Sequence, residues 1–226
     1  MKTNFYYFIF LFLLMSCVSE KNSPEFIEKT TGRYLFNANE IIEIYFKESV
    51  LYAKWRGKDD IKPLKINDSS FYFKEINEKL IFISSPKTHI QLAEKREHEG
   101  VKYEFKKMKK GDKTPKEYFD SNQFDKALNS FLLIQKNDSL NAVIRESRLN
   151  RMGYNYLREN EFKKAIEIFK INVALYPKSS NVYDSLGDAY LSNKDTVKAV
   201  ENYQKSLVFN NKNRNAIKAL KKISKK

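Results

Sequence analysis

A pattern of small and aromatic residues recurs after 34 residues in the second half of the chain, and it constrains the fold more than any other feature. The first copy contains Leu149, Met152, Gly153, Tyr156, Ala165 and Phe169, and the second contains Tyr183, Leu186, Gly187, Tyr190, Ala199 and Tyr203. Glycine and alanine allow two helices to approach closely, and an aromatic ring fills the space beside them. The repeat therefore predicts antiparallel helix pairs that stack into an array.

This pattern resembles the tetratricopeptide repeat, and the resemblance implies a module that binds partners and performs no chemistry of its own. After a linker over residues 109–115, the hydrophobic period changes from two to about 3.6 residues. The expected helices are Lys116–Ser121, Phe124–Gln135, Ala142–Glu159, Glu161–Tyr176, Val182–Ser192, Thr196–Phe209 and a capping helix over Asn213–Lys226. Ala127 and Phe131 form a degenerate first copy, because they precede Ala165 and Phe169 by 38 residues rather than 34.

In this repeat family, the first helix of each pair lines a concave surface. The resemblance therefore implies a partner-binding groove made by residues of the second and third pairs: Asn150, Tyr154, Leu157, Arg158, Asp184, Asp188 and Leu191. The alternative is that these side chains form an ordinary solvated helix face. The family's basic clamp for C-terminal carboxylates is not matched, because Asp184 and Asp188 carry negative charge.

Residues 26–108 are rich in aromatic and β-branched side chains that alternate with polar ones, and turn residues separate the runs at intervals of about ten. The eight expected strands are Gly32–Asn37, Glu40–Lys47, Leu51–Arg56, Ile61–Ile66, Ser70–Glu75, Lys79–Ser84, His89–Lys95 and Val101–Lys107. Such a meander predicts a small barrel or a two-sheet sandwich. The expected fold class is α+β with two domains, an antiparallel β-domain followed by a helical solenoid over residues 116–226.

The order of aromatic residues in this region also resembles the small β-domain appended to serine β-lactamase-like hydrolases. The residues that carry the resemblance are Gly32, Tyr34, Leu51, Tyr52, Phe71, Phe73, Ile81, Phe82, Tyr103, Phe105 and Lys107. The resemblance implies an accessory module, because the catalytic domain of that family is not part of this sequence. The interior of the β-domain is expected to be filled by side chains, with an apolar ligand as the alternative.

No combination of residues indicates an enzyme. Ser84 and Lys87 match a Ser-x-x-Lys nucleophile motif, but that chemistry needs a helix, and Pro86 places them in a turn at a strand end. His98 has several glutamates near it in sequence but no cysteine and no second histidine at ligand spacing. No catalytic residue, metal site or cofactor is therefore expected.

The N-terminus indicates export. Lys2 precedes an unbroken apolar run over residues 5–15, which is too short to span a bilayer and typical of a signal peptide over residues 1–16. Leu14-Met15-Ser16-Cys17 resembles the lipobox of bacterial lipoproteins, which implies that Cys17 is lipidated and becomes the first residue of the mature chain. Residues 17–25 read as a polar tether.

Val18 stands where lipoproteins retained at the inner membrane carry Asp, so the resemblance implies an outer-membrane location in the cell envelope. The net charge is +14, and residues 109–226 hold 24 basic and 13 acidic side chains. No zinc-binding, helix-turn-helix or RNA-binding motif accompanies this charge, so nucleic-acid binding is not expected.

Three functional hypotheses follow from the sequence. The leading one is a lipid-anchored scaffold whose repeats bind a protein or peptide partner. The second is a carrier of an apolar ligand in the β-domain, and the third is an accessory module for a separately encoded serine hydrolase. The identity of the partner and the oligomeric state have no signature in the sequence.

Overall fold

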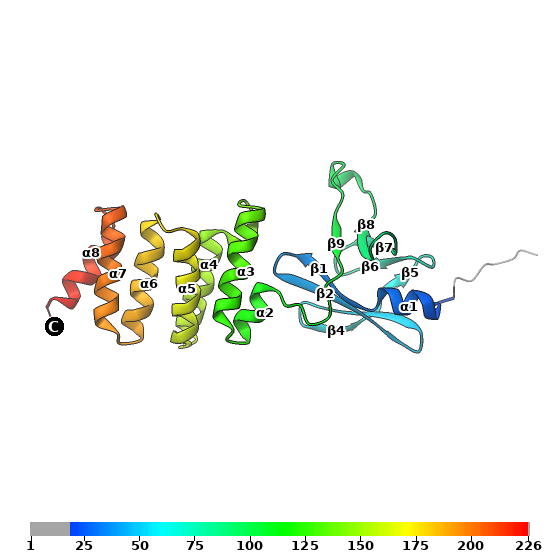
Figure 1. Ribbon diagram of the computed structural model, residues 1–226, viewed down its shortest axis with the longest axis horizontal. Coiled ribbons are helices and arrows are strands. Elements are labelled where there is room, and N and C mark those ends of the chain that lie inside the picture. The colour runs from blue at the N-terminus through cyan, green and yellow to red at the C-terminus, as the bar shows by residue number, and fades with distance from the viewer. Residues whose placement is uncertain (1–18, 226) are drawn as a thin grey trace, which may run out of the picture. The chain divides into compact units, whose positions relative to one another are not determined.

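The computed structural model describes residues 19–225, which form two compact units (Figure 1). One unit comprises the chain up to Phe36 together with Ile41–Lys110, and the other comprises Asn37–Glu40 and the chain from Gly111 onward. The signal peptide predicted over residues 1–16 and the predicted lipidation site Cys17 lie outside the described residues. None of the helices in residues 19–225 is long and apolar enough to cross a membrane.

The first unit contains two antiparallel sheets. The strands of the first sheet, in spatial order, are β1 (Gly32–Asn37), β2 (Glu40–Lys47), β3 (Val50–Trp55) and β4 (Lys58–Ile61). Those of the second are β5 (Leu64–Lys65), β6 (Ser70–Phe73), β7 (Glu78–Ile83), β8 (His89–Leu92) and β9 (Glu104–Lys106). A short 3-10 helix, η1 (Arg96–His98), interrupts the connection between β8 and β9.

Both sheets are open, so the barrel considered from the sequence is wrong. The predicted strand over residues 61–66 is divided between β4 and β5, because Pro63 has no N–H to continue a ladder. The chain changes from one sheet to the other at this proline. The two sheets share one core, in which Tyr34, Leu51 and Phe71 are almost completely buried.

A short helix precedes the strands and was not expected from the sequence. α1 (Pro24–Thr30) begins inside the predicted tether over residues 17–25, with the Ser23 hydroxyl accepting a hydrogen bond from the Phe26 amide and proline in the first turn. This serine–proline pair is a helix-start signal that the analysis of the tether overlooked. The Phe26 ring then packs against Phe46 of the first sheet, at 6.1 Å between centroids, and against Phe71 and Phe82 of the second, at 5.8 and 5.5 Å.

The second unit consists of paired helices followed by a single helix. These are α2 (Pro115–Asp120), α3 (Phe124–Asn137), α4 (Glu146–Arg158), α5 (Phe162–Leu175), α6 (Ser180–Ser192), α7 (Thr196–Phe209) and α8 (Arg214–Ile223), with a 3-10 turn η2 (Ala142–Ile144) before α4. The predicted helix over residues 142–159 is therefore interrupted at Arg145. Eight residues, 138–145, separate α3 from α4, whereas four, 176–179, separate α5 from α6, which explains the longer first spacing.

The glycines and alanines of the repeat lie where the sequence pattern places them. A Cβ atom on Gly153 would stand 2.4 Å from the Phe169 ring, and one on Gly187 would stand 2.7 Å from the Tyr203 ring. Both distances are shorter than van der Waals contact, so neither position accepts a larger residue without movement of the ring. Ala127, Ala165 and Ala199 are completely buried, as expected for contacts between paired helices.

Replacement of Ala199 tests this packing. Ala199→Leu adds atoms to a completely buried position and should lower the free energy of unfolding by ~1–3 kcal/mol, measured by chemical denaturation of residues 18–226. Val197→Leu is the matched control, because Val197 lies on the same helix with 71% of its surface exposed. Equal stability of the two variants would contradict the assigned helix contact.

Candidate functional site

The predicted groove residues lie on α4 and α6, and the structure joins two of them directly. The Tyr154 hydroxyl of α4 donates to the Asp188 carboxylate of α6 at 2.8 Å and lies 3.3 Å from the Ser185 hydroxyl. The other oxygen of Asp188 accepts a hydrogen bond from the Tyr203 hydroxyl of α7 at 2.7 Å. Asp188 therefore joins three helices through two tyrosine hydroxyls.

These contacts fix the aromatic part of the predicted groove. The Tyr154 ring packs edge-on against Phe169, with 5.3 Å between the ring centroids. Burial raises the pKa of the Tyr154 and Tyr203 hydroxyls well above their usual value, so both remain protonated donors. Tyr154 is therefore a half-buried side chain with a fixed orientation.

The other groove residues of the sequence analysis differ in their surroundings. Leu157 and Leu191 are half-buried and pack against the apolar cluster between α5, α6 and α7. Arg158 is exposed and donates to Asn155 of its own helix. The carboxamide oxygen of Asn150 is buried without a hydrogen-bond partner. Their assignment to a binding groove stays a prediction.

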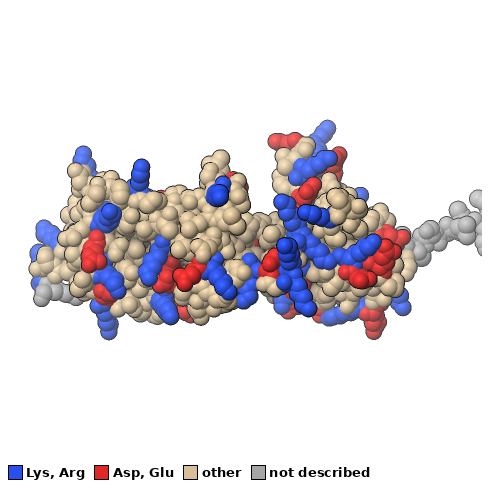
Figure 2. Space-filling model, in the orientation of Figure 1, with Lys and Arg blue, Asp and Glu red and all other residues tan. Residues whose placement is uncertain are grey.

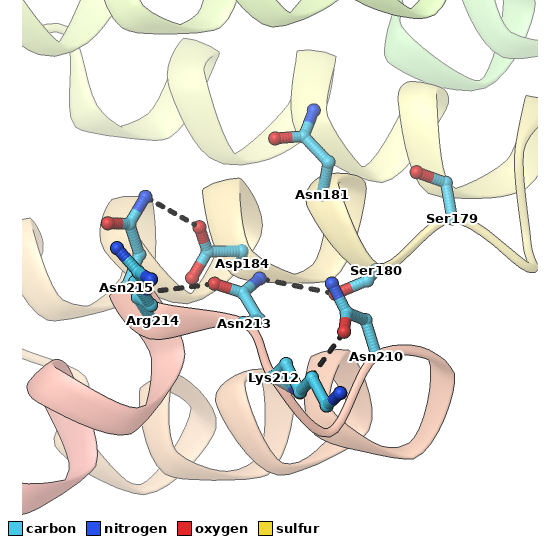
Figure 3. A pocket seen from close by; sticks show the side chains of 9 residues that line it. All are labelled: Ser179, Ser180, Asn181, Asp184, Asn210, Lys212, Asn213, Arg214 and Asn215. Carbon is cyan, nitrogen blue, oxygen red and sulfur yellow. Dashed lines mark hydrogen bonds between the residues drawn. The ribbon is translucent and has the colours of Figure 1, made fainter.

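Asp184 adjoins an open pocket of about 560 Å³ on the same side of the helical unit (Figure 3). Its walls come from the start of α6, the α7–α8 connection and the start of α8. The lining residues are Ser179, Ser180, Asn181, Asp184, Asn210, Lys212, Asn213, Arg214 and Asn215. The lining consists of polar and charged side chains, with no aromatic side chain among the nine.

Asn213 organises one wall of this pocket. Its carboxamide nitrogen donates to the Ser206 and Ser180 hydroxyls at 2.9 and 3.2 Å, and its oxygen accepts from the Asn215 amide at 3.0 Å. The same oxygen also accepts from the Ala216 amide at 3.3 Å and so caps α8. The wall is therefore a preformed set of amides and hydroxyls.

Asp184 is the most unusual residue of the pocket, because only 3% of its surface is exposed. Its Oδ2 atom lies 3.5 Å from the carboxamide nitrogen of Asn215, and its Oδ1 atom has no hydrogen-bond partner. Burial, followed by the negative charge of Asp188, raises the pKa of Asp184 to about 6. A carboxylate in these surroundings destabilises the folded state at neutral pH unless a donor reaches it.

Sequence analysis missed the contribution of the last helix to this site. The 34-residue register that relates the two repeat copies also relates Ser179 to Asn213 and Asn181 to Asn215. Extension of that register beyond α7 would have brought these asparagines into the candidate site. They were instead assigned to a capping helix with no further role.

The β-unit places the residues of the rejected catalytic motif as the sequence predicts. Ser84 follows the end of β7, and both Ser84 and Lys87 are exposed in the connection to β8 rather than on a helix. His98 contacts Glu78 at 3.2 Å. Within residues 19–225, no group of three histidine, cysteine, aspartate or glutamate side chains is arranged to hold a metal ion.

The excess positive charge is distributed rather than concentrated. Figure 2 shows lysine and arginine side chains spread over one face of the helical unit, with acidic side chains among them. Several of these lysines pair with acids on the same helix, as Lys170 does with Glu167 at 2.9 Å and Lys198 with Asp195 at 3.0 Å. Exposed pairs of this kind contribute little to stability but keep the surface mixed in sign.

Comparison with known proteins agrees with the repeat pattern. No family model matches the chain. The chain is 31% identical over 115 residues to the chloroplastic tetratricopeptide repeat domain-containing protein PYG7 of Arabidopsis thaliana, which covers 47% of this chain. The chain spans 38% of the length of that relative. Together with the helix pairs and their glycine–aromatic contacts, this similarity indicates a tetratricopeptide-like repeat fold for the helical unit.

Solved tetratricopeptide repeat structures also match about half of the chain. The repeat domain of Arabidopsis OM64 is 19% identical with a TM-score of 0.35, covering 49% of this chain and 88% of that one. The second repeat domain of human RPAP3, solved in complex with an HSP70 peptide, is 17% identical with a TM-score of 0.36, covering 50% of this chain and 90% of that one.

Replacement of Asp184 should change how stability depends on pH. Because burial places the folded-state pKa near 6, above its ordinary value of 3.8, folding favours the protonated acid. Stability from this group is therefore present below about pH 4 and is lost as pH rises through 6. Asp184→Asn should remove this loss and stabilise the protein at pH 7 by an amount on the order of 3 kcal/mol.

Urea denaturation at several pH values between about 4 and 7 measures this effect. Glu201→Gln is the control, because it removes an acid from an exposed position on α7 and should leave the pH profile unchanged. An Asp184→Asn profile parallel to that of the unchanged protein would show that Asp184 is not the buried acid described above.

Proposed function

We propose that the protein is a non-catalytic, lipid-anchored envelope protein whose helical repeats bind a segment of a polypeptide partner. The observation that carries the proposal is the α4–α6 face, defined by Asn150, Tyr154, Arg158, Asp184 and Asp188. Hydrogen bonds hold Tyr154 and Asp188 in one orientation, and the pocket beside Asp184 adjoins them. A prearranged surface of this kind lowers the entropy that binding costs.

The composition of the α4–α6 face favours a polypeptide. It offers an aromatic ring, an exposed guanidinium and carboxylates on neighbouring helices, and arginine and tyrosine are the residues that carry most binding energy at protein interfaces. A polypeptide segment presents both charge signs and both donors and acceptors along its length. A small neutral ligand would use only part of this surface.

The proposed anchor is independent of the binding surface. Cys17 stands at the end of the apolar run, and two or more acyl chains would hold the protein at a membrane, at ~0.8 kcal/mol for each buried methylene. Val18 supports the outer membrane as the location, and the absence of a second apolar run in the printed sequence supports lipidation as the means.

The two alternative functions receive unequal support. A ligand carrier would need a cavity bordered by the aromatic side chains of the β-unit. The space beside Leu51 and Phe71 measures about 10 Å³, roughly the minimum for one water molecule. The role of an accessory to a separately encoded hydrolase is compatible with polypeptide binding, since the hydrolase would then be the partner.

The binding surface can be tested by removing its two anchors together. Tyr154→Ala with Arg158→Ala should weaken partner binding by ~2 kcal/mol or more. The partner is first identified by mass spectrometry after co-purification from membranes, and the affinity of the purified pair is then measured. Because Tyr154 also packs on Phe169, the melting temperature of the variant is measured in parallel.

The matched control is Tyr183→Ala with Arg148→Ala, which removes the same residue types from α6 and α4 but outside the α4–α6 face. Phe82→Leu in the β-unit should lower stability without a specific binding defect, because Phe82 is a buried core residue. Partner binding that survives the α4–α6 double variant and is lost in Phe82→Leu would transfer the function to the β-unit.

The anchor is tested by Cys17→Ala. The variant should remain uncleaved or become soluble, because the thiol is the proposed site of acylation and no other apolar segment precedes the β-unit. Metabolic labelling with a fatty-acid analogue followed by membrane fractionation measures both properties. Equal labelling of the variant and the unchanged protein would exclude Cys17 as the lipidated residue.

A further inference from the structure

Asp184 lacks a hydrogen-bond donor that its surroundings require. Its Oδ1 atom is buried and has no partner, and Asp184 has no ion-pair partner among residues 19–225. Buried carboxylate oxygens in folded proteins nearly always accept hydrogen bonds, because the loss of water is otherwise not compensated. The residue lies in the wall of the 560 Å³ pocket, so a donor can approach from that side (Figure 3).

A second unsatisfied acceptor occupies the equivalent position of the preceding repeat. Asn150 precedes Asp184 by 34 residues, and its carboxamide oxygen is also buried without a partner. Position 150 on α4 and position 184 on α6 belong to helices that the Tyr154–Asp188 hydrogen bond joins. Two acceptors at the same place in successive repeats indicate that the absent group supplies donors.

The nearest donor to Asp184 is weakly held. The carboxamide nitrogen of Asn215 is 3.5 Å from Oδ2, at the outer limit of a hydrogen bond. A charged donor that displaced this amide would reach the carboxylate, and a planar guanidinium could engage both oxygens at once. The displaced Asn215 amide would return to solvent, since its backbone remains fixed by the Asn213 cap.

Resting on the proposed polypeptide-binding function, we infer that the pocket beside Asp184 receives a basic side chain of the partner segment, with arginine preferred to lysine. The guanidinium pairs with the Asp184 carboxylate from the pocket side. Glu146 contributes a second acid at the edge of the site, where its carboxylate accepts a hydrogen bond from Asn181 at 2.8 Å. The amides of Asn181 and Asn215 supply acceptor oxygens for the remaining donors of the guanidinium.

The opposite charge preference is the main competing possibility. Lys212 and Arg214 line the same pocket, and Ser179 makes no side-chain hydrogen bond to the first turn of α6. These groups would attract an anion, but an anion would bring a second negative charge to the buried Asp184 carboxylate and leave its Oδ1 unpaired. A cation removes both problems, so the carboxylate decides the sign.

Occupation of the site should depend on pH in a defined direction. The charged and titratable groups around Asp184 are Asp188 on α6, Glu146 on α4, Tyr154 and Tyr203 on α4 and α7, and Lys212 and Arg214 beside α8. Both histidines of the chain are in the β-unit, so none contributes here. With the pKa of Asp184 near 6, a change from about pH 7.5 to about pH 5 should weaken binding roughly tenfold.

The test uses glycine peptides, blocked at both ends, that carry one central arginine, lysine, glutamine or glutamate. Binding to the full chain in detergent is followed by saturation-transfer difference NMR. We expect the arginine peptide to bind about tenfold more tightly than the glutamine peptide, with lysine between them. Asp184→Asn should reduce arginine binding about tenfold and abolish its pH dependence, whereas Glu201→Gln should change neither.

The outcomes separate this inference from the proposed function. Equal arginine binding by Asp184→Asn and the unchanged protein, or tighter binding of the glutamate peptide, would overturn the basic-side-chain assignment. If all four peptides bind equally and the Tyr154→Ala, Arg158→Ala variant loses them, polypeptide binding stands and only the inference fails. If no peptide binds and that double variant also retains the co-purified partner, both proposals fail.

Discussion

The contact between a glycine on one helix and an aromatic ring on the next determines the geometry of the helical unit. Gly153 meets Phe169, and Gly187 meets Tyr203, at distances that leave no room for a Cβ atom. The absence of a side chain lets the helices of a pair approach, and the ring fixes how far they approach. Because the same contact recurs after 34 residues, successive pairs adopt the same arrangement and their outer residues fall into register.

That register also builds the candidate site. The ring of Tyr203 fills the space beside Gly187, and its hydroxyl continues to the Asp188 carboxylate, where it meets the hydroxyl of Tyr154 from the preceding pair. One aromatic residue therefore packs a helix pair and orients an acid at the surface. Asp188 is satisfied by this arrangement, whereas Asp184, one turn earlier, retains an unpaired oxygen and a raised pKa. The difference between these two acids is the strongest chemical asymmetry of the α4–α6 face.

The β-unit is stabilised in a different way. Its two open sheets meet over one apolar core, and Phe26 from α1 contacts aromatic rings of both. The Tyr34 hydroxyl donates to the Thr30 carbonyl at 2.8 Å and so attaches the end of α1 to β1. The helix therefore belongs to the fold of the unit, and its interior is occupied by side chains rather than by a large cavity.

The sequence by itself determined the elements whose signals are local or periodic. Two strands, Gly32–Asn37 and Glu40–Lys47, and the helix Thr196–Phe209 have the predicted limits, because turn residues and apolar periodicity depend only on neighbours along the chain. The burial of Ala165 and Ala199 followed from the repeat in the same way. Tertiary structure decided the rest. Whether the strands close into a barrel depends on pairing between distant segments, and the surroundings of Asp184 depend on Asn213 and Asn215, which approach it only when α8 packs against α6 and α7. A pattern of residue types records which side chains can be buried, but the hydrogen bonds that each finds there exist only after packing brings separate helices together.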